Sequence, residues 1–327
     1  MKHFRRHLVI AAAATVCISA MGHAQAQSYP TKAITVVVSY PPGGDTDAMA
    51  RLFSEKLSTR LKQPVVVENK PGAGGTIGNS YVSRAPADGY TLLFTPNPFT
   101  TAPMVMKLPA ASSYDALNGF APVIHTADQA VLLVANPSAS VKTVAEMVAL
   151  AKTGKPLSYG SPGAGSPMHI GAEWLNRSAG IKVQHVPYRG VGPAVVDVLA
   201  GHIPFAYVTL GPVAQHISSG KLVALALTDP KRSPLLPTVP TLSELGYKDV
   251  SAGAWNGFFA PKGTPPDIIR MLNGHFNEII KMPDVVEKMA AFGAVPVGGP
   301  STDLAKLNAA DFQRLGKVIQ ELGIVAE

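Results

Sequence analysis

Residues 34–51 read ITVVVSYPPGGDTDAMAR, a run of β-branched residues that reaches two glycines and then continues in a helical pattern. The same order of apolar strand, glycine loop and helix returns in VVVENKPGAGGTIGNS at residues 65–80 and in LSYGSPGAGSPMHIGAEWL at residues 157–175. Short, continuously apolar strands suit a parallel sheet that is covered on both faces. Their alternation with helices predicts an α/β, doubly wound fold.

Further strands and helices continue this alternation along the chain. Helices with one apolar face are predicted over residues 48–61 and 268–279, the second opening with a Thr264 cap and Pro265. Because the predicted strands are more numerous than one sheet would readily hold, we expect two lobes, each with a mainly parallel sheet and helices on both faces. The predicted strands span residues 34–39, 65–68, 90–95, 130–135, 157–161, 183–187, 203–209, 222–228 and 255–260.

One proline-rich stretch suggests where the lobes divide. No Gly/Ser linker or charge run separates two halves of the chain, but PKRSPLLPTVP at residues 230–240 resembles the end of one lobe and a return to the other. We therefore predict lobe 1 over residues 27–125 plus 250–327, and lobe 2 over residues 126–249.

The first residues have the form of an export signal. Three Lys or Arg residues within the first six positions precede an apolar run from residue 8 to about residue 21, and AQA follows at residues 24–26. This pattern predicts a secretory signal peptide over residues 1–26, cleaved near Ala26, and an exported protein. The apolar run is shorter than the roughly 20 residues that a transmembrane helix needs.

Processing changes what the composition implies. Of the 327 residues, 46% are hydrophobic and 15% are charged, which excludes an intrinsically disordered chain. Cys17, the only cysteine, lies in the predicted signal, so the mature protein is neither a disulfide scaffold nor a thiol enzyme. Lipid attachment at Cys17 is disfavoured because the β-branched Val16 precedes it. Loss of three basic residues takes the formal charge from +7 to +4, too small and dispersed for nucleic-acid binding.

The glycine loops indicate an anion site. Glycine allows positive φ and close approach of a ligand to the backbone, and the N–H groups of a helix's first turn lie beyond the carboxyl end of the preceding strand. Each such helix end favours an anion by about 0.3–1 kcal/mol. Two or three of them meeting at one cleft would bind a carboxylate or a phosphate.

Other chemistries fit the residues less well. A P-loop is excluded because Lys70 precedes its glycines, and a dinucleotide fingerprint fails because Ile77 occupies its last glycine position. No GxSxG elbow is present. His169 and Glu173 have a spacing that could hold a metal on one helix face, but no third ligand is evident nearby. Capping of the first helix explains Asp45 and Asp47 without acid–base chemistry.

The ordered motifs resemble a known family. The chain is similar to the substrate-binding proteins of tripartite tricarboxylate transporters, the Bug-type periplasmic receptors. The resemblance implies a two-lobed periplasmic binding protein of the type II, Venus-flytrap form, which closes over a small carboxylate. It covers nearly the whole mature chain in family order, through YPTKAITVVVSYPPGGDTDAMAR, VVVENKPGAGGTIG, ADGYTLLF, LSYGSPGAGSPMHIGAEWL, VQHVPYRGVGPAVVDVLAGHI, LALTDPKRSPLLPTVPTLSELG, WNGFFAPKGTP and AAFGAVPVGG.

The resemblance also implies ligand-binding positions. Lobe 1 would supply backbone amides from two loops, and lobe 2 would supply amides and a hydroxyl from a third. Arg189 is the candidate for a direct ion pair with the ligand, or else it braces the rim of the cleft. The expected ligand-binding residues are Tyr40, Gly43, Gly44, Asp45, Thr46, Asp47, Ala73, Gly74, Thr95, Asn97, Ser161, Gly163, Ala164, Gly165, Ser166, Tyr188, Arg189 and Thr209.

The functional expectation is a solute receptor without a cofactor, a metal or catalytic residues. FAYVTLGP at residues 205–212 lacks an acidic residue that could pair with a ligand's ammonium group, which favours a plain mono- or dicarboxylate, aliphatic or aromatic. The receptor would act as a monomer and deliver its ligand to the permease subunits of a tripartite tricarboxylate-type transporter. A sensor that signals to a kinase is an alternative, and a periplasmic hydrolase is a weaker one.

Overall fold

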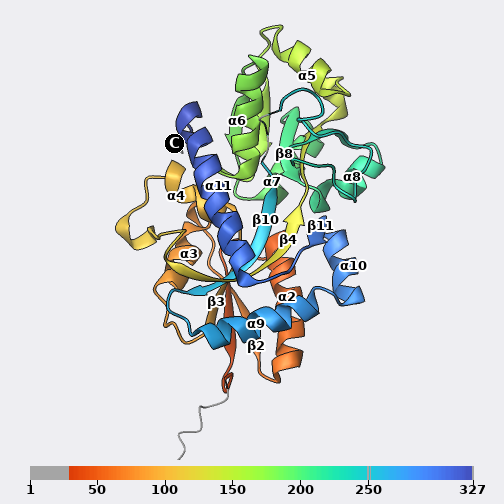
Figure 1. Cartoon of the computed structure of the whole chain (residues 1–327). Coiled ribbons are helices and arrows are strands. Elements are labelled where there is room, and N and C mark those ends of the chain that lie inside the picture. Colours follow the sequence, from red (N-terminus) through yellow and green to blue (C-terminus); the bar gives the residue numbers. More distant parts are fainter. Residues whose placement is uncertain (1–28, 249, 251, 326–327) are drawn as a thin grey trace, which may run out of the picture. The chain divides into compact units, whose positions relative to one another are not determined.

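The computed structural model describes residues 29–325, except residues 249 and 251. The described residues from Lys32 onward form one compact unit (Figure 1). The predicted signal peptide and its cleavage site lie outside the described residues. Within the described part, no helix has both the length and the apolar character needed to cross a bilayer.

The first lobe is built on a six-stranded sheet with the order β11-β4-β10-β3-β1-β2. Its strands are β1 (Ile34–Val38), β2 (Val65–Asn69), β3 (Thr91–Pro96), β4 (Phe120–Gln129), β10 (Ala254–Pro261) and β11 (Ala294–Pro296). Its helices are α2 (Asp45–Leu61), α3 (Thr76–Ser83), α4 (Pro98–Val105), α9 (Pro266–Ile279), α10 (Pro283–Ala291) and α11 (Ser301–Leu322), with short 3₁₀ turns η1 (Ala73–Gly75) and η2 (Ala110–Ser112).

The second lobe is built on a five-stranded sheet with the order β7-β6-β8-β5-β9. Its strands are β5 (Val131–Ala135), β6 (Ser158–Ser161), β7 (Gln184–Pro187), β8 (Phe205–Thr209) and β9 (Val223–Leu227). Its helices are α5 (Val144–Ala151), α6 (Pro167–Ala179), α7 (Val191–Ala200) and α8 (Ala214–Ser218), with 3₁₀ turns η3 (Pro137–Ala139) and η4 (Gly211–Val213).

Both faces of each sheet are covered. In the second lobe, Leu133 of β5 packs into one apolar cluster and its neighbour Leu132 packs into the other. In the first lobe, Phe258 of β10 stacks on Phe276 of α9 at 4.2 Å, while Phe259 stacks on Phe99 of α4 at 4.7 Å. The α/β, two-lobed prediction is thus confirmed.

Both sheets are mixed, with antiparallel pairs beside the predicted parallel ones. β10 is antiparallel to β3 and β4, and β5 is antiparallel to β8 and β9. The cause lies at the lobe junction. A chain that crosses from the other lobe enters a sheet at the edge where the parallel strands end, so it must run the opposite way. Accordingly, the first residue of β5, Val131, pairs with the last residue of β8, Thr209.

All the predicted strands are present, but two further strands were not predicted. β4 carries Pro122, His125 and Asp128, which interrupt its apolar pattern, and β11 has only three residues. The predicted cap of α9 is also wrong. That helix begins at Pro266, with Pro265 as the capping residue, because the Thr264 hydroxyl donates to the Pro261 carbonyl instead.

The junction between the sheets is short. β4 ends at Gln129 and β5 begins at Val131, so a single residue, Ala130, carries the chain from one sheet to the other. The predicted boundary at residue 125 falls inside β4, and the boundary at residue 249 precedes β10. The extent of each whole lobe stays a prediction.

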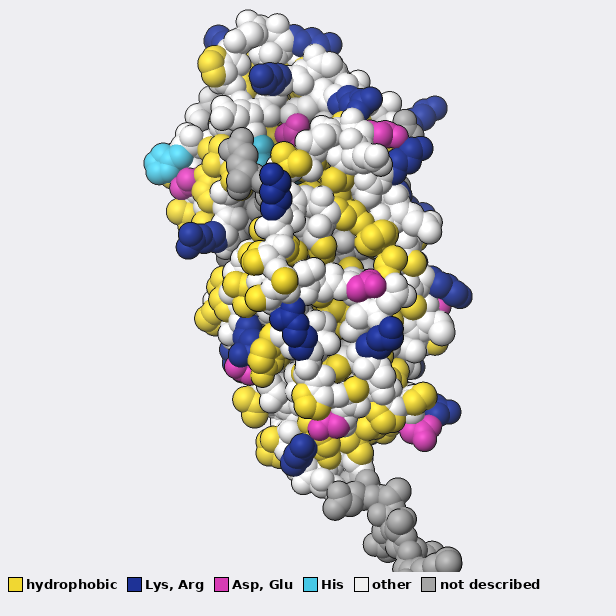
Figure 2. All heavy atoms as spheres, turned by 90° about the vertical axis from the view of Figure 1, so that its left-hand side faces the viewer, with side chains coloured by type: hydrophobic (Ala, Val, Ile, Leu, Met, Phe, Trp, Pro, Cys, Tyr) yellow, Lys and Arg dark blue, Asp and Glu magenta, His cyan; other side chains and the backbone are white. Residues whose placement is uncertain are grey.

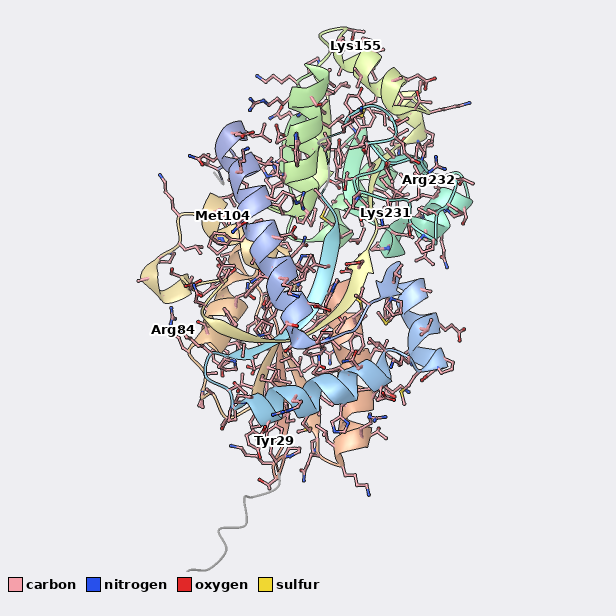
Figure 3. The ribbon with its side chains drawn as sticks, viewed as in Figure 1. Tyr29, Arg84, Met104, Lys155, Lys231 and Arg232 are labelled. Atoms are coloured by element: carbon pink, nitrogen blue, oxygen red, sulfur yellow. The ribbon has the colours of Figure 1, made fainter. Side chains whose placement is uncertain are left out.

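Helix α11 also joins the lobes. It packs on both α4 and α6, and the Arg177 side chain of α6 donates to the Glu321 carbonyl of α11 at 2.7 Å. Met104 of α4 lies against α11 where Gly316 leaves room for it (Figure 3).

Basic side chains do not gather on the face shown in Figure 2. There, Lys and Arg stand apart from one another among apolar and acidic side chains. This dispersion agrees with the modest excess of 28 Lys and Arg residues over 21 Asp and Glu residues in the sequence.

Candidate functional site

Four loops from the two lobes surround one cavity of about 550 Å³. We name them loop 1 (residues 40–46), loop 2 (residues 70–75), loop 3 (residues 161–166) and loop 4 (residues 188–193). Each follows a strand and leads into the N-terminus of a helix or short helical turn. The cavity therefore lies beyond the carboxyl ends of the strands, where open α/β sheets bind ligands.

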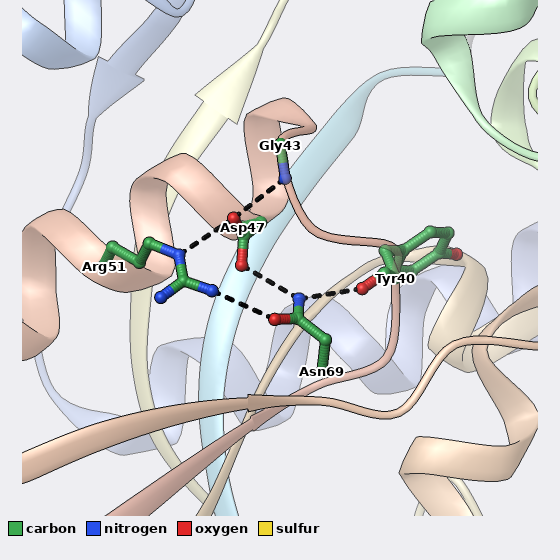
Figure 4. A network of polar contacts seen from close by, with 5 residues as sticks. All are labelled: Tyr40, Gly43, Asp47, Arg51 and Asn69. Carbon is green, nitrogen blue, oxygen red and sulfur yellow. Dashed lines mark hydrogen bonds and ion pairs between the residues drawn. The ribbon is translucent and has the colours of Figure 1, made fainter.

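Loop 1 is held by a polar network beneath it (Figure 4). Asp47 accepts hydrogen bonds from the Gly43 N–H at 3.0 Å, from Arg51 at 3.0 Å and from the Asn69 amide at 2.9 Å. The same Asn69 amide donates to the Tyr40 carbonyl at 3.0 Å. Burial acts to raise the pKa of Asp47, but the hydrogen bonds from Arg51, Gly43 and Asn69 outweigh it and lower that pKa. Asp47 is thus an ionised brace for the loop.

Loop 2 requires glycine for its backbone. Gly72, Gly74 and Gly75 all have positive φ, and the Tyr40 hydroxyl donates to the Gly74 carbonyl at 3.3 Å. Further on, a Cβ at Gly78 would lie 2.8 Å from the Lys70 carbonyl oxygen, so the first turn of α3 packs closely against the loop.

Loop 3 touches the other lobe. Gly163 and Gly165 have φ of +144° and +74°. The Thr101 hydroxyl of α4 donates to the Gly165 carbonyl at 2.6 Å, and a Cβ at Gly165 would lie 2.3 Å from Val105. Ser166 caps α6 by accepting from the His169 N–H at 3.2 Å. Glycine at residue 165 therefore allows the two lobes to meet.

Loop 4 is a further glycine loop, which was not predicted from the sequence. Gly190, with φ of +111°, is the N-terminal capping residue of α7, and Val191, Gly192 and Pro193 line the cavity beside Arg189. The signal was present in the sequence, because RGVGP joins the strand VQHVP to an apolar helical pattern. Of this loop, only Tyr188 and Arg189 were predicted as site residues.

Several backbone N–H groups around the cavity are available to a ligand. No hydrogen bond joins the N–H of Gly44, Ala164, Met168, Val191 or Gly192 to another described residue. Gly44 and Ala164 lie in loops 1 and 3, and the other three residues lie in the first turns of α6 and α7, so both lobes contribute. Helix N-termini carry partial positive charge, so their convergence favours an anion in this cavity.

The two charged side chains that line the cavity differ in their hydrogen bonding and exposure. Among the described lining residues, Arg189 is the only Lys or Arg and Asp45 is the only carboxylate. Asp45 accepts hydrogen bonds from the Thr209 hydroxyl and from the Gln129 amide, both at 3.1 Å. Arg189 is exposed to solvent. Gln129, which in turn accepts from Asn256 at 2.6 Å, was not predicted as a site residue.

Asn97 lines the cavity and has one polar side-chain atom without a partner in the described structure. Its amide group donates to the Gly253 carbonyl at 2.8 Å, and its backbone N–H donates to the Trp255 carbonyl at 3.1 Å. Its side-chain oxygen is buried without a hydrogen-bond partner in the described structure. A buried oxygen of this kind can accept a hydrogen bond from a ligand hydroxyl.

Most of the predicted site residues line the cavity. They are Tyr40, Gly43, Gly44, Asp45, Thr46, Gly74, Asn97, Gly163, Ala164, Ser166, Arg189 and Thr209. The lining residues that were not predicted are Pro41, Pro42, Pro96, Pro98, Gln129, Pro162, Pro167, Met168, Gly190, Val191, Gly192, Pro193, Pro212 and Ala254.

The other predicted residues do not line the cavity. Several lie just behind its wall: Ser161 contacts His185, Thr95 donates to Asn79 at 3.4 Å, and the Tyr188 hydroxyl donates to Asp197 at 2.6 Å. The residues outside the lining are Asp47, Ala73, Thr95, Ser161, Gly165 and Tyr188.

His169 and Glu173, whose spacing could have held a metal, have other hydrogen-bond partners. Nδ1 of His169 accepts from the Gly165 N–H at 3.1 Å, and Glu173 accepts from the Tyr159 hydroxyl at 2.5 Å. Among the residues that the structure describes, no group of three or more His, Cys, Asp or Glu side chains is arranged to hold a metal ion.

Two sheets whose glycine loops and helix N-termini meet at one cavity define a two-lobed solute-binding protein. A sequence profile described as "Tripartite tricarboxylate transporter family receptor" matches residues 49–324, and the chain belongs to this family. The family consists of periplasmic binding receptors and not of enzymes, as the sequence had indicated.

Relatives and solved structures agree over almost the whole chain. "Protein BugT" of Bordetella pertussis is 38% identical over 302 residues, covering 91% of both chains. A structure of an R. palustris protein with adipate has a TM-score of 0.84 and 31% identity, covering 91% of this chain and 100% of its own. MatC of Rhodopseudomonas palustris with bound malate has a TM-score of 0.80 and 29% identity, covering 89% and 100%.

Proposed function

We propose that this protein captures a small carboxylate between its lobes and delivers it to the permease of a tripartite tricarboxylate-type transporter. The observation that carries the proposal is the convergence of unpartnered N–H groups from loops 1 and 3 and from the first turns of α6 and α7 on one cavity, whose described lining has a single basic side chain. Such groups solvate a carboxylate without a second charged residue.

A dicarboxylate of about four to six carbons is the preferred class. The related structures hold adipate and malate, each with two carboxylates. In this chain, one carboxylate would take the amides of loops 1 and 3, and the second would pair with Arg189. The buried oxygen of Asn97 would accept from a hydroxyl of the kind that malate carries. Aromatic carboxylates and monocarboxylates stay in the test panel.

Affinity is the direct test. Micromolar binding corresponds to about −8 kcal/mol, which several charge-assisted hydrogen bonds and desolvation on closure can supply. We expect isothermal titration calorimetry with malate, succinate, adipate, benzoate and phthalate to find at least one micromolar ligand, and the matching amides to bind far more weakly. Failure of every carboxylate to bind would overturn the proposal.

Transport and sensing are separated in cells. If the protein serves a permease, deletion of its gene abolishes uptake of the bound carboxylate. If it serves a sensor kinase, deletion abolishes induction of target genes while uptake continues. Mass spectrometry of the periplasmic protein tests export, with a mature N-terminus at Gln27 expected for cleavage after Ala26.

A further inference from the structure

Two histidines that do not line the ligand cavity lie directly behind loop 3. We propose that His169 and His185 are positioning residues, which hold the two glycines of loop 3 so that the Ala164 N–H between them points into the cavity. The proposal rests on the function proposed above, since it concerns the shape of the same carboxylate site.

The two imidazole rings are stacked. Their centroids lie 3.8 Å apart with an interplanar angle of 12°. His169 comes from the first turn of α6, and His185 comes from β7. The ring of Tyr159, on β6, continues the stack at 5.1 Å from His185. Because each ring is supplied by a different element of the second lobe, the stack is a rigid support fixed by the fold.

Each imidazole reaches one glycine of loop 3. Nδ1 of His169 accepts directly from the Gly165 N–H at 3.1 Å. Nε2 of His185 lies 2.7 Å from the Ser161 hydroxyl, whose oxygen accepts from the Gly163 N–H at 3.3 Å. Both glycines have positive φ, so neither conformation is fixed by a side chain of its own. The histidine pair supplies the missing constraint.

The contact of His169 requires a neutral ring. Nδ1 of His169 can accept from Gly165 only when its proton is on Nε2. Burial, together with the nearby His185, lowers the pKa of His169 to about 3, and burial lowers that of His185 to about 4. The ionisable neighbours are Tyr159 and Glu173 beside the stack, and Arg177, Lys182 and Glu321 around the cavity that His185 borders.

The support comes from the second lobe alone. Loop 3 is also held by Thr101 and Val105, but both belong to the first lobe and would leave if the lobes parted. The bond from Gly165 to His169 would remain. The pair thus presents loop 3 preformed to an incoming ligand, which reduces the ordering that binding would otherwise require.

Three variants test this role in binding. His169→Asn keeps an acceptor oxygen near the place of Nδ1, whereas His169→Leu removes it at similar size. We expect His169→Leu to raise the Kd for the best-binding dicarboxylate of malate, succinate and adipate at least ten-fold. His169→Asn should stay within about three-fold of the unmodified protein. His275→Leu, a half-buried histidine of α9 in the first lobe, is the matched control and should leave Kd unchanged.

A second measurement needs no ligand and separates this proposal from the proposed function. In the free protein, ¹⁵N NMR should show His169 neutral at pH 7 with its proton on Nε2. Exchange of the Gly165 amide hydrogen should be at least ten-fold faster in His169→Leu and restored in His169→Asn.

The outcomes are distinct. If no carboxylate binds while the tautomer and exchange results hold, the proposed function fails and the positioning role stands. A proton on Nδ1 of His169, or Gly165 exchange that is equal in all variants, overturns the positioning role. So does an equal loss of affinity in the Asn and Leu variants. Should His169→Leu not fold, the tautomer and the Asn variant still decide.

Discussion

The Asp45 carboxylate accepts a hydrogen bond from the Thr209 hydroxyl at 3.1 Å, and this bond joins the first turn of α2 in the first lobe to the end of β8 in the second. The same carboxylate oxygen accepts from Gln129 at the lobe junction. One acidic side chain thus links both lobes and their connection at the edge of the cavity. It also places a negative charge where the amides favour an anion.

Replacing this charge should strengthen binding of a carboxylate. Asp45→Asn keeps an acceptor oxygen for Thr209 and removes the repulsion between two anions, so we expect Kd to fall about ten-fold at low salt. Calorimetry at two salt concentrations measures the effect, with Asp267→Asn on the exposed surface of α9 as the control. A ten-fold rise in Kd would instead show that Asp45 accepts a hydrogen bond from the ligand.

Arg189 should contribute to affinity and little to stability. It is exposed and is the only basic side chain among the described lining residues, so Arg189→Gln removes a ligand contact without breaking a packed core. A hydrogen bond to a charged group is worth about 1.5–3 kcal/mol, which predicts a loss of roughly ten-fold or more in dicarboxylate affinity with an unchanged Tm.

The control for Arg189 is Lys155→Gln, at the end of the second lobe remote from the cavity (Figure 3). If Arg189→Gln binds dicarboxylates as tightly as the unmodified protein, the side chain only braces the rim of the cleft. A monocarboxylate provides a further comparison, because it has no second carboxylate for Arg189 and should lose much less.

Gly165 should act through the contact between the lobes. With φ of +74° and a Cβ that would lie 2.3 Å from Val105, Gly165→Ala strains loop 3 and pushes α4 away. We expect at least a ten-fold loss of affinity. The double variant Gly165→Ala with Val105→Ala should recover part of it, since the clash is removed while the backbone strain remains. No recovery would show that strain in loop 3 is the whole effect.

The sequence predicted the loops better than the side chains that face the ligand. A strand that ends in glycines and leads into a helix is a local pattern, and it located loops 1, 2 and 3. Which face of a loop points into the cavity depends on packing from behind. Asp47 and Ser161 lie close to the loop glycines in sequence, but neither lines the cavity. Asp47 instead accepts a hydrogen bond from Arg51, and Ser161 contacts His185.

Features that depend on both lobes could not be predicted from local sequence patterns. Gln129 lines the cavity because β4 ends where the chain crosses to β5, and β4 itself was not predicted. The direction of β5 and of β10 is also set where the chain crosses between the lobes. The antiparallel pairs in the sheets therefore depend on this connection and not on the composition of any strand. The lining residue Ala254 likewise begins β10, where the chain returns to the first lobe.

Asp229 should make stability depend on pH in an unusual direction. It lies after β9, where its carboxylate accepts from the Val131 N–H at 2.8 Å. Burial, with a smaller effect of Asp128, raises its pKa to about 7. Asp229 lines a second cavity, together with the basic residues Lys231, Arg232, Lys248 and Arg314. Figure 3 labels Lys231 and Arg232, which follow Asp229 in the chain.

The sign follows from proton binding. Between the unfolded pKa near 4 and the folded pKa near 7, the folded protein holds a proton on Asp229 that the unfolded chain has lost. The group's contribution to stability is therefore full below about pH 4 and is lost as the pH rises to 7. Asp229→Asn stays neutral, keeps an acceptor for Val131 and should escape this loss.

Calorimetric melting at pH 5 and pH 8 tests this prediction. The Tm of Asp229→Asn minus that of the unmodified protein should be larger at pH 8, by up to roughly 5 °C, because each unit of pKa shift corresponds to about 1.4 kcal/mol. Asp128→Asn, whose carboxylate is exposed, should show a much smaller change. A Tm difference that is equal at both pH values would mean that Asp229 is already ionised at pH 5 in the folded protein, and that hydrogen bonding at the junction outweighs its burial.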